Sequence, residues 1–305
     1  MRCGEASTIA LISHPKYRQN QELLHDAAVL VGEVIRKHFE FRLVSDLPVV
    51  LAEKVIEVHV SQILKTQRAN GLWKIEEAER KSFWLLAALQ HAGLLGKLLR
   101  EQAFRYDPFV AFQQRADLFG YVIRCEFAQS PLNTDQDLRQ KLVSEIYTCQ
   151  EPNGSWENTI VLTCKKLEEL SLLGENSQQD CILKAVEWLF SMFNADLEGF
   201  HVGVVYGKPG HNMFSTPDRQ AEFKIALKER PEWDPKQLCY NHLAMIQNGI
   251  AIQTLIRLGY SGDERVEKAC DNLYFLKQKY GGWCQSNIMQ GLAYQRWVAK
   301  AKQGV

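Results

Sequence analysis

The sequence Gln150-Glu-Pro-Asn-Gly154-Ser-Trp156 is one of several copies of the same turn in this chain. Gln67-Arg-Ala-Asn-Gly71-Leu-Trp73 and Gln278-Lys-Tyr-Gly281-Gly-Trp283 keep its order of Gln, Gly and Trp, and a weaker copy lies at Gly199-Phe200. Each copy follows one helix-like stretch and precedes another. The chain is therefore predicted to be a series of repeated helical hairpins.

The glycines of the four turns lie at positions 71, 154, 199 and 281, so they are separated by 83, 45 and 82 residues. One interval is a single repeat and two are doubles, which indicates a repeat of roughly 40–45 residues. The doubles predict two further repeats without the turn motif, near Gln113 and near Cys239. We therefore expect six helical hairpins.

The residues of the turn have structural reasons to be there. Pro152-Asn153-Gly154 and Ala69-Asn70-Gly71 are typical of turns, because Gly accepts positive φ and Asn tolerates it. The Trp buries a large apolar surface and has one N–H to satisfy. The Gln is able to bond the free backbone groups at a helix end. We interpret these residues as structural staples between hairpins.

These turns resemble those of the terpenoid cyclases and the protein prenyltransferases, whose α/α toroids share them. The stretch from Asn248 to Ala269, with Gly281-Gly-Trp283 after it, is similar to the prenyltransferase and squalene-oxidase repeat. The resemblance implies an all-α (α/α)6 toroid in which the helix after each turn lines a central cavity. We expect an N-terminal extension with a helix in residues 1–46 and the toroid in residues 47–305.

The stretch from about 196 to 236 is rich in Gly and Pro and does not fit the helical pattern. Long irregular insertions in a compact fold are usually functional or disordered, and the aromatic residues here argue against plain disorder. We interpret it as a loop over one mouth of the ring; a surface elaboration without a catalytic role is the alternative. The predicted substrate-binding residues are Tyr206, His211 and Trp233 in this loop, and Glu157 at the cavity rim.

Composition limits the classes of partner. Lys plus Arg equals Asp plus Glu at 36 each, and no basic stripe is present, which argues against nucleic acid. No apolar run approaches the ~18–20 residues of a membrane span, and the apolar stretch near Met1 is too short for a signal peptide. The eight cysteines contain no CxxC pair, so we expect reduced thiols and a cytoplasmic location.

A zinc site is predicted because two cysteines occupy equivalent positions in successive repeats. Cys284 follows a turn Trp, and Cys239 lies 45 residues earlier, one repeat length away. His242 is three residues after Cys239, on the same helical face. Residues at the start of inner helices meet at one rim, where the helix dipole favours thiolate, and two thiolates with an imidazole suit Zn²⁺ with an open fourth position. The predicted ligands are Cys239, His242 and Cys284, with His201 or His211 as substitutes, and the predicted catalytic residues are Cys239, Cys284 and His201.

This placement is similar to the zinc sites of protein prenyltransferases and lanthionine cyclases. The match is partial, because the residue two before Cys239 is Gln237 rather than Asp, and no Cys-His dipeptide is present. Two buried thiols and a histidine bonded to backbone are the alternative interpretation.

The resemblance implies an enzyme that acts on a hydrophobic, isoprenoid-like or lipid-like substrate, with a rim zinc activating a nucleophile. Two alternatives stay open. The first is a metal-independent terpenoid cyclase or lyase, although the Asp-x-Asp-Asp acid motif is absent and Asp135-Gln-Asp137 is better interpreted as a helix cap. The second is a non-catalytic toroid that binds a partner or ligand.

Overall fold

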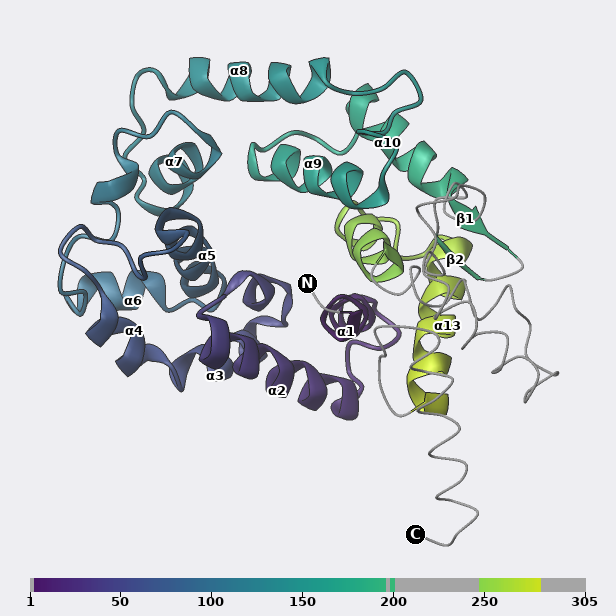
Figure 1. The fold of residues 1–305 in the computed structure, drawn as a ribbon, viewed down its shortest axis with the longest axis horizontal. Helices are drawn as coiled ribbons and strands as arrows, with labels where there is room; N and C mark the ends of the chain where they lie inside the picture. The colour runs from purple at the N-terminus through teal and green to yellow at the C-terminus, as the bar shows by residue number, and fades with distance from the viewer. Residues whose placement is uncertain (1–2, 196–197, 201–246, 281–305) are drawn as a thin grey trace, which may run out of the picture. The chain divides into compact units, whose positions relative to one another are not determined.

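The computed structural model describes residues 3–195, 198–200 and 247–280 (Figure 1). Helices account for nearly all the regular structure of these residues, and the prediction of an all-α chain is confirmed at that level. The helical elements are α1 (Cys3–Ser13), α2 (Gln21–His38), η1 (Arg42–Asp46), α3 (Val49–Glu57), α4 (Val60–Thr66), α5 (Ala78–His91), α6 (Leu95–Arg100), η2 (Val110–Phe112), α7 (Leu118–Val122), η3 (Ile123–Phe127), α8 (Asp135–Thr148), α9 (Ile160–Leu172), α10 (Asp180–Ser191), the helical segment 247–257 and α13 (Glu264–Tyr280). A two-stranded antiparallel sheet joins β1 (Phe193–Asn194) to β2 (Gly199–Phe200).

The chain divides into two compact units. Unit 1 contains Met1–Pro15, Glu151–Lys165 and Asp180–Val305, and unit 2 contains Lys16–Gln150 and Lys166–Gln179. Residues 1–15 belong to unit 1 and residues 16–46 to unit 2, and the predicted boundary between an extension and a toroid at residue 46 stays a prediction.

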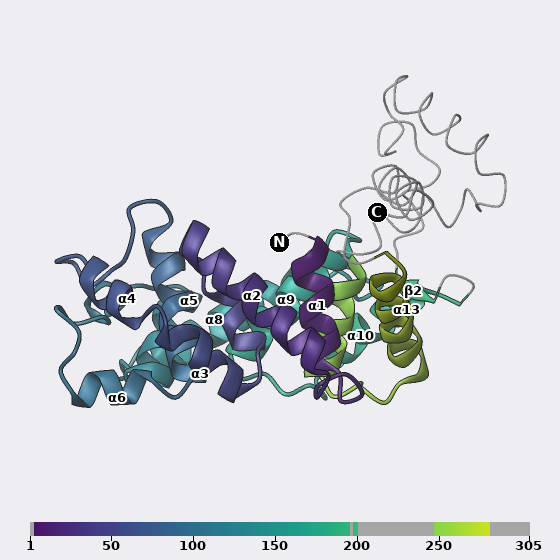
Figure 2. The same ribbon diagram turned by 90° about the horizontal axis from the view of Figure 1, so that it is seen from below.

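The core of unit 1 includes the N-terminal helix. From Ala6 to Ile12 every residue of α1 is buried, so this part of the helix has no solvent face. Gly249 makes the close contact possible, because a Cβ there would lie 2.5 Å from the carbonyl carbon of Ala6. His14 Nε2 lies 2.9 Å from the carbonyl oxygen of Ser261, and both views show α1 beside α13 (Figures 1 and 2). The first helix of the chain is thus packed against residues from its far end.

Unit 2 is built around α5, which packs against η1, α3 and α6. Phe83 of α5 is fully buried and stacks on Phe119, with ring centroids 4.5 Å apart. The longest helix within residues 1–46 is α2, and it begins where the side chain of Asn20 accepts a hydrogen bond from the Leu23 amide at 3.1 Å. Such an N-cap satisfies one of the amides that a helix start leaves without an intrahelical partner.

The first turn motif, between α4 and α5, has a defined hydrogen-bond pattern. The Arg68 amide donates to the Leu72 carbonyl, and the Gly71 amide donates to the Arg68 carbonyl, both at 2.9 Å. The side chain of Asn70 accepts from the Leu72 amide at 3.3 Å. Gly71 has φ +79°, a conformation that residues with a Cβ rarely adopt.

The second turn motif, between α8 and α9, repeats this pattern position for position. The Glu151 amide donates to the Ser155 carbonyl, and the Gly154 amide donates to the Glu151 carbonyl, both at 2.8 Å. Asn153 accepts from the Ser155 amide at 3.0 Å, and Gly154 has φ +91°. The positive φ predicted for the turn glycines is confirmed, whereas Asn70 and Asn153 do not have positive φ and contribute through their side-chain bonds.

A side chain of the following helix closes each turn. The backbone amide of Trp73 donates to Ser82 Oγ at 2.9 Å, and that of Trp156 donates to Thr163 Oγ1 at 3.1 Å. Both Trp residues are buried, so these amides have no water to bond and need a protein partner. We call this bond the aromatic clamp, because it fixes the turn to the start of the next helix.

The Gln of the first turn has a different partner from the one expected. Gln67 is buried, and its Nε2 donates to the carbonyls of Gly71 (3.2 Å) and Tyr106 (2.9 Å), while its Oε1 accepts from the Tyr106 amide (3.0 Å). It therefore joins the turn to a segment 39 residues later. The carbonyl of Ile63 near the end of α4 is bonded instead by Trp73 Nε1, at 2.8 Å.

Replacing Gly71 by Ala should cost more stability than the same change at Gly93. Both residues have positive φ, which costs a residue with a Cβ about 1–2 kcal/mol. A Cβ at Gly71 would lie 2.2 Å from the Asp107 carbonyl oxygen, whereas one at Gly93 would meet nothing within 4 Å. We expect losses in the free energy of unfolding of about 1 kcal/mol for Gly93→Ala and about 3 kcal/mol or more for Gly71→Ala, measured by urea denaturation. Equal losses would contradict the close approach of the two backbones.

Gln67→Glu should destabilise the chain by about 2–4 kcal/mol, because it removes a donor from two carbonyls and buries a charge. Gln62→Glu is the matched control, since Gln62 is an exposed residue of the same helix. Urea denaturation at neutral pH compares the two variants. A Gln67→Glu protein as stable as the Gln62→Glu protein would show that the bonds to Tyr106 contribute nothing.

Candidate functional site

Most of the residues predicted from the sequence as site residues lie outside the described part of the chain. These are His201, Tyr206, His211, Trp233, Cys239, His242 and Cys284. The expected repeat near Cys239 lies there too. Glu157 is the predicted site residue that the structure describes.

Glu157 is exposed and directly follows the buried Trp156, with φ 52°. Lys74 stands in the same place after Trp73, is also exposed, and has φ 64°. Both turns thus place the next side chain in a left-handed backbone position open to solvent. Because α5 begins at Ala78 and α9 at Ile160, the residue after each Trp lies in the turn that precedes the helix.

Within the described ranges, no three His, Cys, Asp or Glu side chains are grouped so that they could hold a metal ion. The cysteines described there, including Cys125, are not joined in disulfides. The zinc site predicted from Cys239, His242 and Cys284 therefore stays a prediction.

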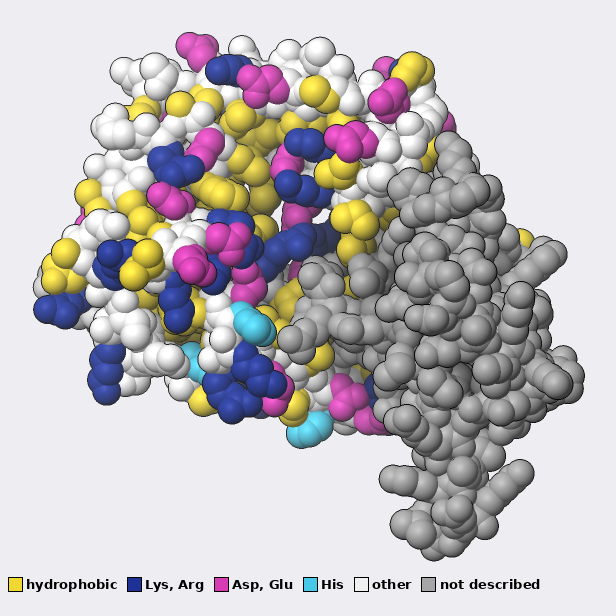
Figure 3. All heavy atoms as spheres, viewed as in Figure 1, with side chains coloured by type: hydrophobic (Ala, Val, Ile, Leu, Met, Phe, Trp, Pro, Cys, Tyr) yellow, Lys and Arg dark blue, Asp and Glu magenta, His cyan; other side chains and the backbone are white. Residues whose placement is uncertain are grey.

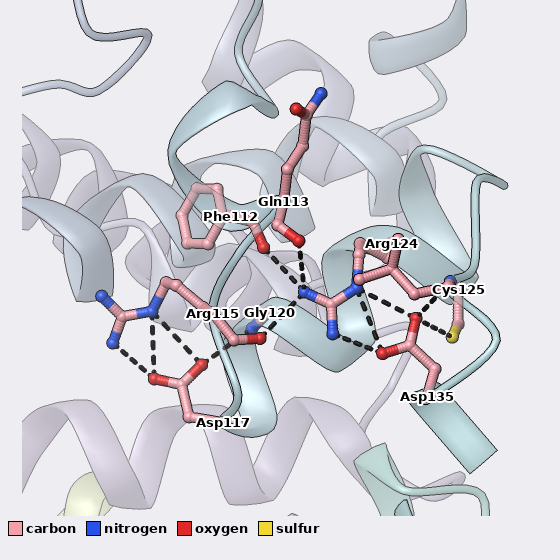
Figure 4. A network of polar contacts seen from close by, with 9 residues as sticks. Phe112, Gln113, Arg115, Asp117, Gly120, Arg124, Cys125 and Asp135 are labelled. Atoms are coloured by element: carbon pink, nitrogen blue, oxygen red, sulfur yellow. Dashed lines mark hydrogen bonds and ion pairs between the residues drawn. The ribbon is translucent and has the colours of Figure 1, made fainter. Parts of the chain in front are cut away.

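The most buried charged group among the described residues is an ion pair in unit 2 (Figure 4). The side chains of Arg124 and Asp135 are each 3% exposed, and Arg124 Nε donates to Asp135 Oδ2 at 2.9 Å. Arg124 Nη1 donates to three carbonyls, those of Phe112 (2.8 Å), Arg115 (2.9 Å) and Gln113 (3.2 Å). One guanidinium from η3 thus holds together the chain around η2, the segment that follows it as far as Arg115, and the start of α8.

Asp135 carries a charge rather than a proton in this setting. The hydrogen bonds from Arg124 lower the pKa of its carboxyl group, and a further bond from the Leu132 amide at 2.8 Å acts in the same direction. A cyclase acid must be kept protonated by a raised pKa, so this carboxylate has the opposite property. The interpretation of this stretch as a helix cap also changes, because Thr134 occupies the N-cap of α8 without a side-chain bond.

The thiol beside this ion pair is not activated. Burial raises the pKa of Cys125, and the negative charge of Asp135 raises it further. Cys125 Sγ lies 3.9 Å from Asp135 Oδ2 and acts as a donor to it. A nucleophilic cysteine needs a lowered pKa, so Cys125 has a packing role.

A second arginine bonds the N-cap of α7. Arg115 Nε donates to Asp117 Oδ2 at 3.0 Å, and Asp117 also accepts from the Gly120 amide at 2.9 Å. Burial acts to raise the pKa of Asp117, but the bonds from Arg115 and Gly120 outweigh it and the pKa is lowered. Arg115 Nη1 lies 3.6 Å from Glu79 of α5, which links α5 to this corner.

Ion pairs continue across the other helices of unit 2. Arg80 Nη2 bonds Glu40 at 2.7 Å, and Arg42 bonds Glu168 at 2.6 Å while its guanidinium lies over the ring of Trp84. Figure 3 shows basic and acidic side chains intermixed over one face of the described chain. These arginines are neutralised by carboxylates, so they form structural links rather than an anion-binding site.

No protein-family model, no curated protein and no solved structure matches the chain. The resemblance to toroid enzymes therefore depends on the turn motifs and their spacing alone. None of the described helices is both long enough and apolar enough to cross a membrane.

Asp135→Asn should lower the free energy of unfolding at pH 7 by about 3–5 kcal/mol, because the buried charge of Arg124 then lacks its partner. Asp137→Asn is the control, since Asp137 is an exposed residue of the same helix; its loss should stay within about 1 kcal/mol.

The same variants test the pH dependence. The pKa of Asp135 is lowered on folding, so the pair stabilises the chain above the unfolded pKa of about 3.9 and this contribution disappears as the pH falls through the folded value. The difference between wild type and Asp135→Asn should therefore shrink below about pH 4, measured by denaturation at a series of pH values. A constant difference down to pH 2 would contradict the ion pair.

Proposed function

We propose that this chain is an enzyme of the terpenoid-cyclase and protein-prenyltransferase type that acts on a hydrophobic, isoprenoid-like substrate. The observation that carries the proposal is the common hydrogen-bond pattern of the turns ending at Trp73 and Trp156, which extends to the aromatic clamp. A turn repeated at the level of individual bonds supports a series of equivalent hairpins. We propose that the hairpins close into an (α/α)6 toroid whose central cavity receives the substrate.

The proposed chemistry uses a zinc ion held by Cys239, His242 and Cys284, with His201 or His211 as a substitute ligand. The position of these residues within the repeat supports this choice. Cys284 follows Trp283 as Glu157 follows Trp156, a position that is open to solvent where the structure describes it.

The choice of Cys239 is supported by sequence distance. It lies 45 residues before Cys284, which is one repeat length, and His242 follows three residues later.

When bound, zinc would act as a Lewis acid and lower the pKa of a coordinated nucleophile. The protein residues have their own tasks. Cys239 and Cys284 would bind as thiolates, which requires each to lose its proton. Tyr206, His211 and Trp233 would contact the substrate, and Glu157, because it is exposed, would be free to bond a polar group at its end.

A non-catalytic binding module is the second candidate, and one observation counts against the third, the metal-independent cyclase. Every Asp or Glu of the described residues whose pKa is shifted has it lowered, by a basic side chain in each case. An acid catalyst needs the reverse, so the metal-independent cyclase alternative receives no support from these groups.

The test of the proposal is metal content together with turnover. Purified protein should contain about one zinc per chain, and Cys239→Ser and Cys284→Ser should each abolish most of it, because a structural or catalytic zinc needs at least three protein ligands. Cys149→Ser is the control, since Cys149 is exposed at the end of α8. Metal analysis by mass spectrometry measures the zinc.

Incubation with farnesyl and geranylgeranyl diphosphate, followed by product analysis, tests the substrate class. Zinc-free protein that still converts these substrates would remove the metal from the proposal. Protein that neither binds nor converts them would favour the non-catalytic module.

A further inference from the structure

The helix α2 lies at the edge of unit 2 and has one face that is exposed to solvent along its whole length (Figure 1). Its inner face is buried through Leu23, Ala27, Val31 and Ile35. The middle of the opposite face is formed by five exposed residues, Glu22, His25, Val29, Glu33 and Arg36. Because they are three or four positions apart, they form one line along the helix, which we call the outer stripe.

Two residues near the middle of this face are not explained by packing within the described part of the chain. Val29 is an apolar side chain that is 52% exposed. Gly32 follows one turn later, in the helix interior, where glycine is less favourable than alanine. A Cβ at Gly32 would meet nothing within 4 Å among the described residues, so no contact there requires glycine.

The charges of the outer stripe are arranged symmetrically about Val29. Glu22 lies seven positions before Val29 and Arg36 seven positions after it, while His25 and Glu33 lie four positions before and after. The acidic start and basic end also suit the dipole of a single helix. The dipole does not require the match between His25 and Glu33, which lie in the interior of the helix.

This symmetry makes the stripe complementary to itself. When two copies of α2 run antiparallel about a two-fold axis at Val29, Glu22 lies opposite Arg36 of the second copy, and His25 lies opposite Glu33. Each of these pairs joins an acidic group to a basic or hydrogen-bond-donating group, and the symmetry forms each pair twice. A parallel arrangement would place Glu22 and Arg36 each against its own copy, and like charges repel. The charges therefore favour the antiparallel pair.

Val29 and Gly32 fit the same arrangement. The Val29 side chains of the two copies meet at the axis, and each inserts between residues one turn apart on the other helix, as in a coiled coil. Packed helices lie about 8–10 Å apart, and small residues at the contact allow the closer distances. Gly32, one turn from Val29, leaves room for this approach.

We propose that the chain binds a second copy of itself through the outer stripe of α2, with the two helices antiparallel about an axis at Val29. An 18-residue helix is about 27 Å long, so this contact alone is smaller than the roughly 1,200–2,000 Å² of a stable interface. The dimer is therefore weak and depends on protein concentration. The inference is independent of the proposed function, because none of the predicted site residues belongs to the stripe.

The first test is charge reversal, with the dimer measured by sedimentation equilibrium over about 1 µM to 1 mM protein, the range of weak complexes. Glu22→Arg and Arg36→Glu each place like charges opposite each other twice and should weaken dimerisation at least about tenfold. The double variant restores opposite charges and should restore the dimer. Glu187→Arg is the control, since Glu187 is an exposed residue of α10, and it should have no effect.

Urea denaturation separates the dimer from the stability of the helix itself. The double variant is the least favourable of the three for the helix dipole, so its midpoint of unfolding should be the lowest although its dimer is restored. A wild-type chain that is monomeric at every concentration would overturn the proposal. A dimer that the single reversals leave unchanged, or that the double variant fails to restore, would overturn it as well.

The second test is disulfide cross-linking of Val29→Cys with oxidised glutathione. The two copies of position 29 meet at the axis, so the peptide that contains this position should be found joined to its own copy by mass spectrometry. His25→Cys is the matched control on the same stripe. Its two copies would lie about 12 Å apart along the helices, at 1.5 Å per residue, whereas the Cα atoms of a disulfide lie within about 7 Å. Equal cross-linking at both positions would contradict the axis at Val29.

Discussion

The backbone amide of the aromatic residue that ends each turn is the group on which the hairpins depend. The amide is buried with its aromatic side chain, and a buried amide without a partner would cost about 1–3 kcal/mol. A short side chain supplies the acceptor in each described case. The acceptors come from Ser82 and Thr163 and, for the Phe200 amide, from Asn248. Because Ser82 and Thr163 lie within the first turns of α5 and α9, satisfying the amide also fixes where each of these helices starts relative to its turn.

The features that follow from local chemistry could be predicted from the sequence. The positive φ of Gly71 and Gly154 and the side-chain bonds of the turn Asn residues involve partners only a few positions away. The partner of Gln67 could not be predicted in this way, because Tyr106 is 39 residues distant and its backbone offers no sequence signal. The place of α1 in unit 1 could not be predicted either, because its contacts with Gly249 and Ser261 join residues more than 240 positions apart.

Less of the candidate site than of the fold could be predicted from the sequence. The place of Glu157 beside a turn follows from the motif, but its exposed left-handed position follows from the hydrogen bonds of the turn. The partner of Asp135 was missed because a helix-cap interpretation considers only adjacent residues, and Arg124 lies eleven positions earlier. The available signal was Arg124 itself, a charged residue directly after the apolar Val122 and Ile123; a charge so placed is usually buried with a partner. The lowered pKa of Asp135 then excludes it as an acid catalyst, which no sequence pattern could show.

The burial of α1 has a consequence for how the protein is made. Ala6 contacts Gly249, which the ribosome adds 243 residues later. At a synthesis rate of roughly 5–20 residues per second, α1 waits about 12–50 seconds for this partner. During that time the apolar residues of α1 lack their partners on the nascent chain. Unit 1 therefore completes its core only after residue 249 has been synthesised, and until then α1 offers ribosome-associated chaperones an apolar segment to bind.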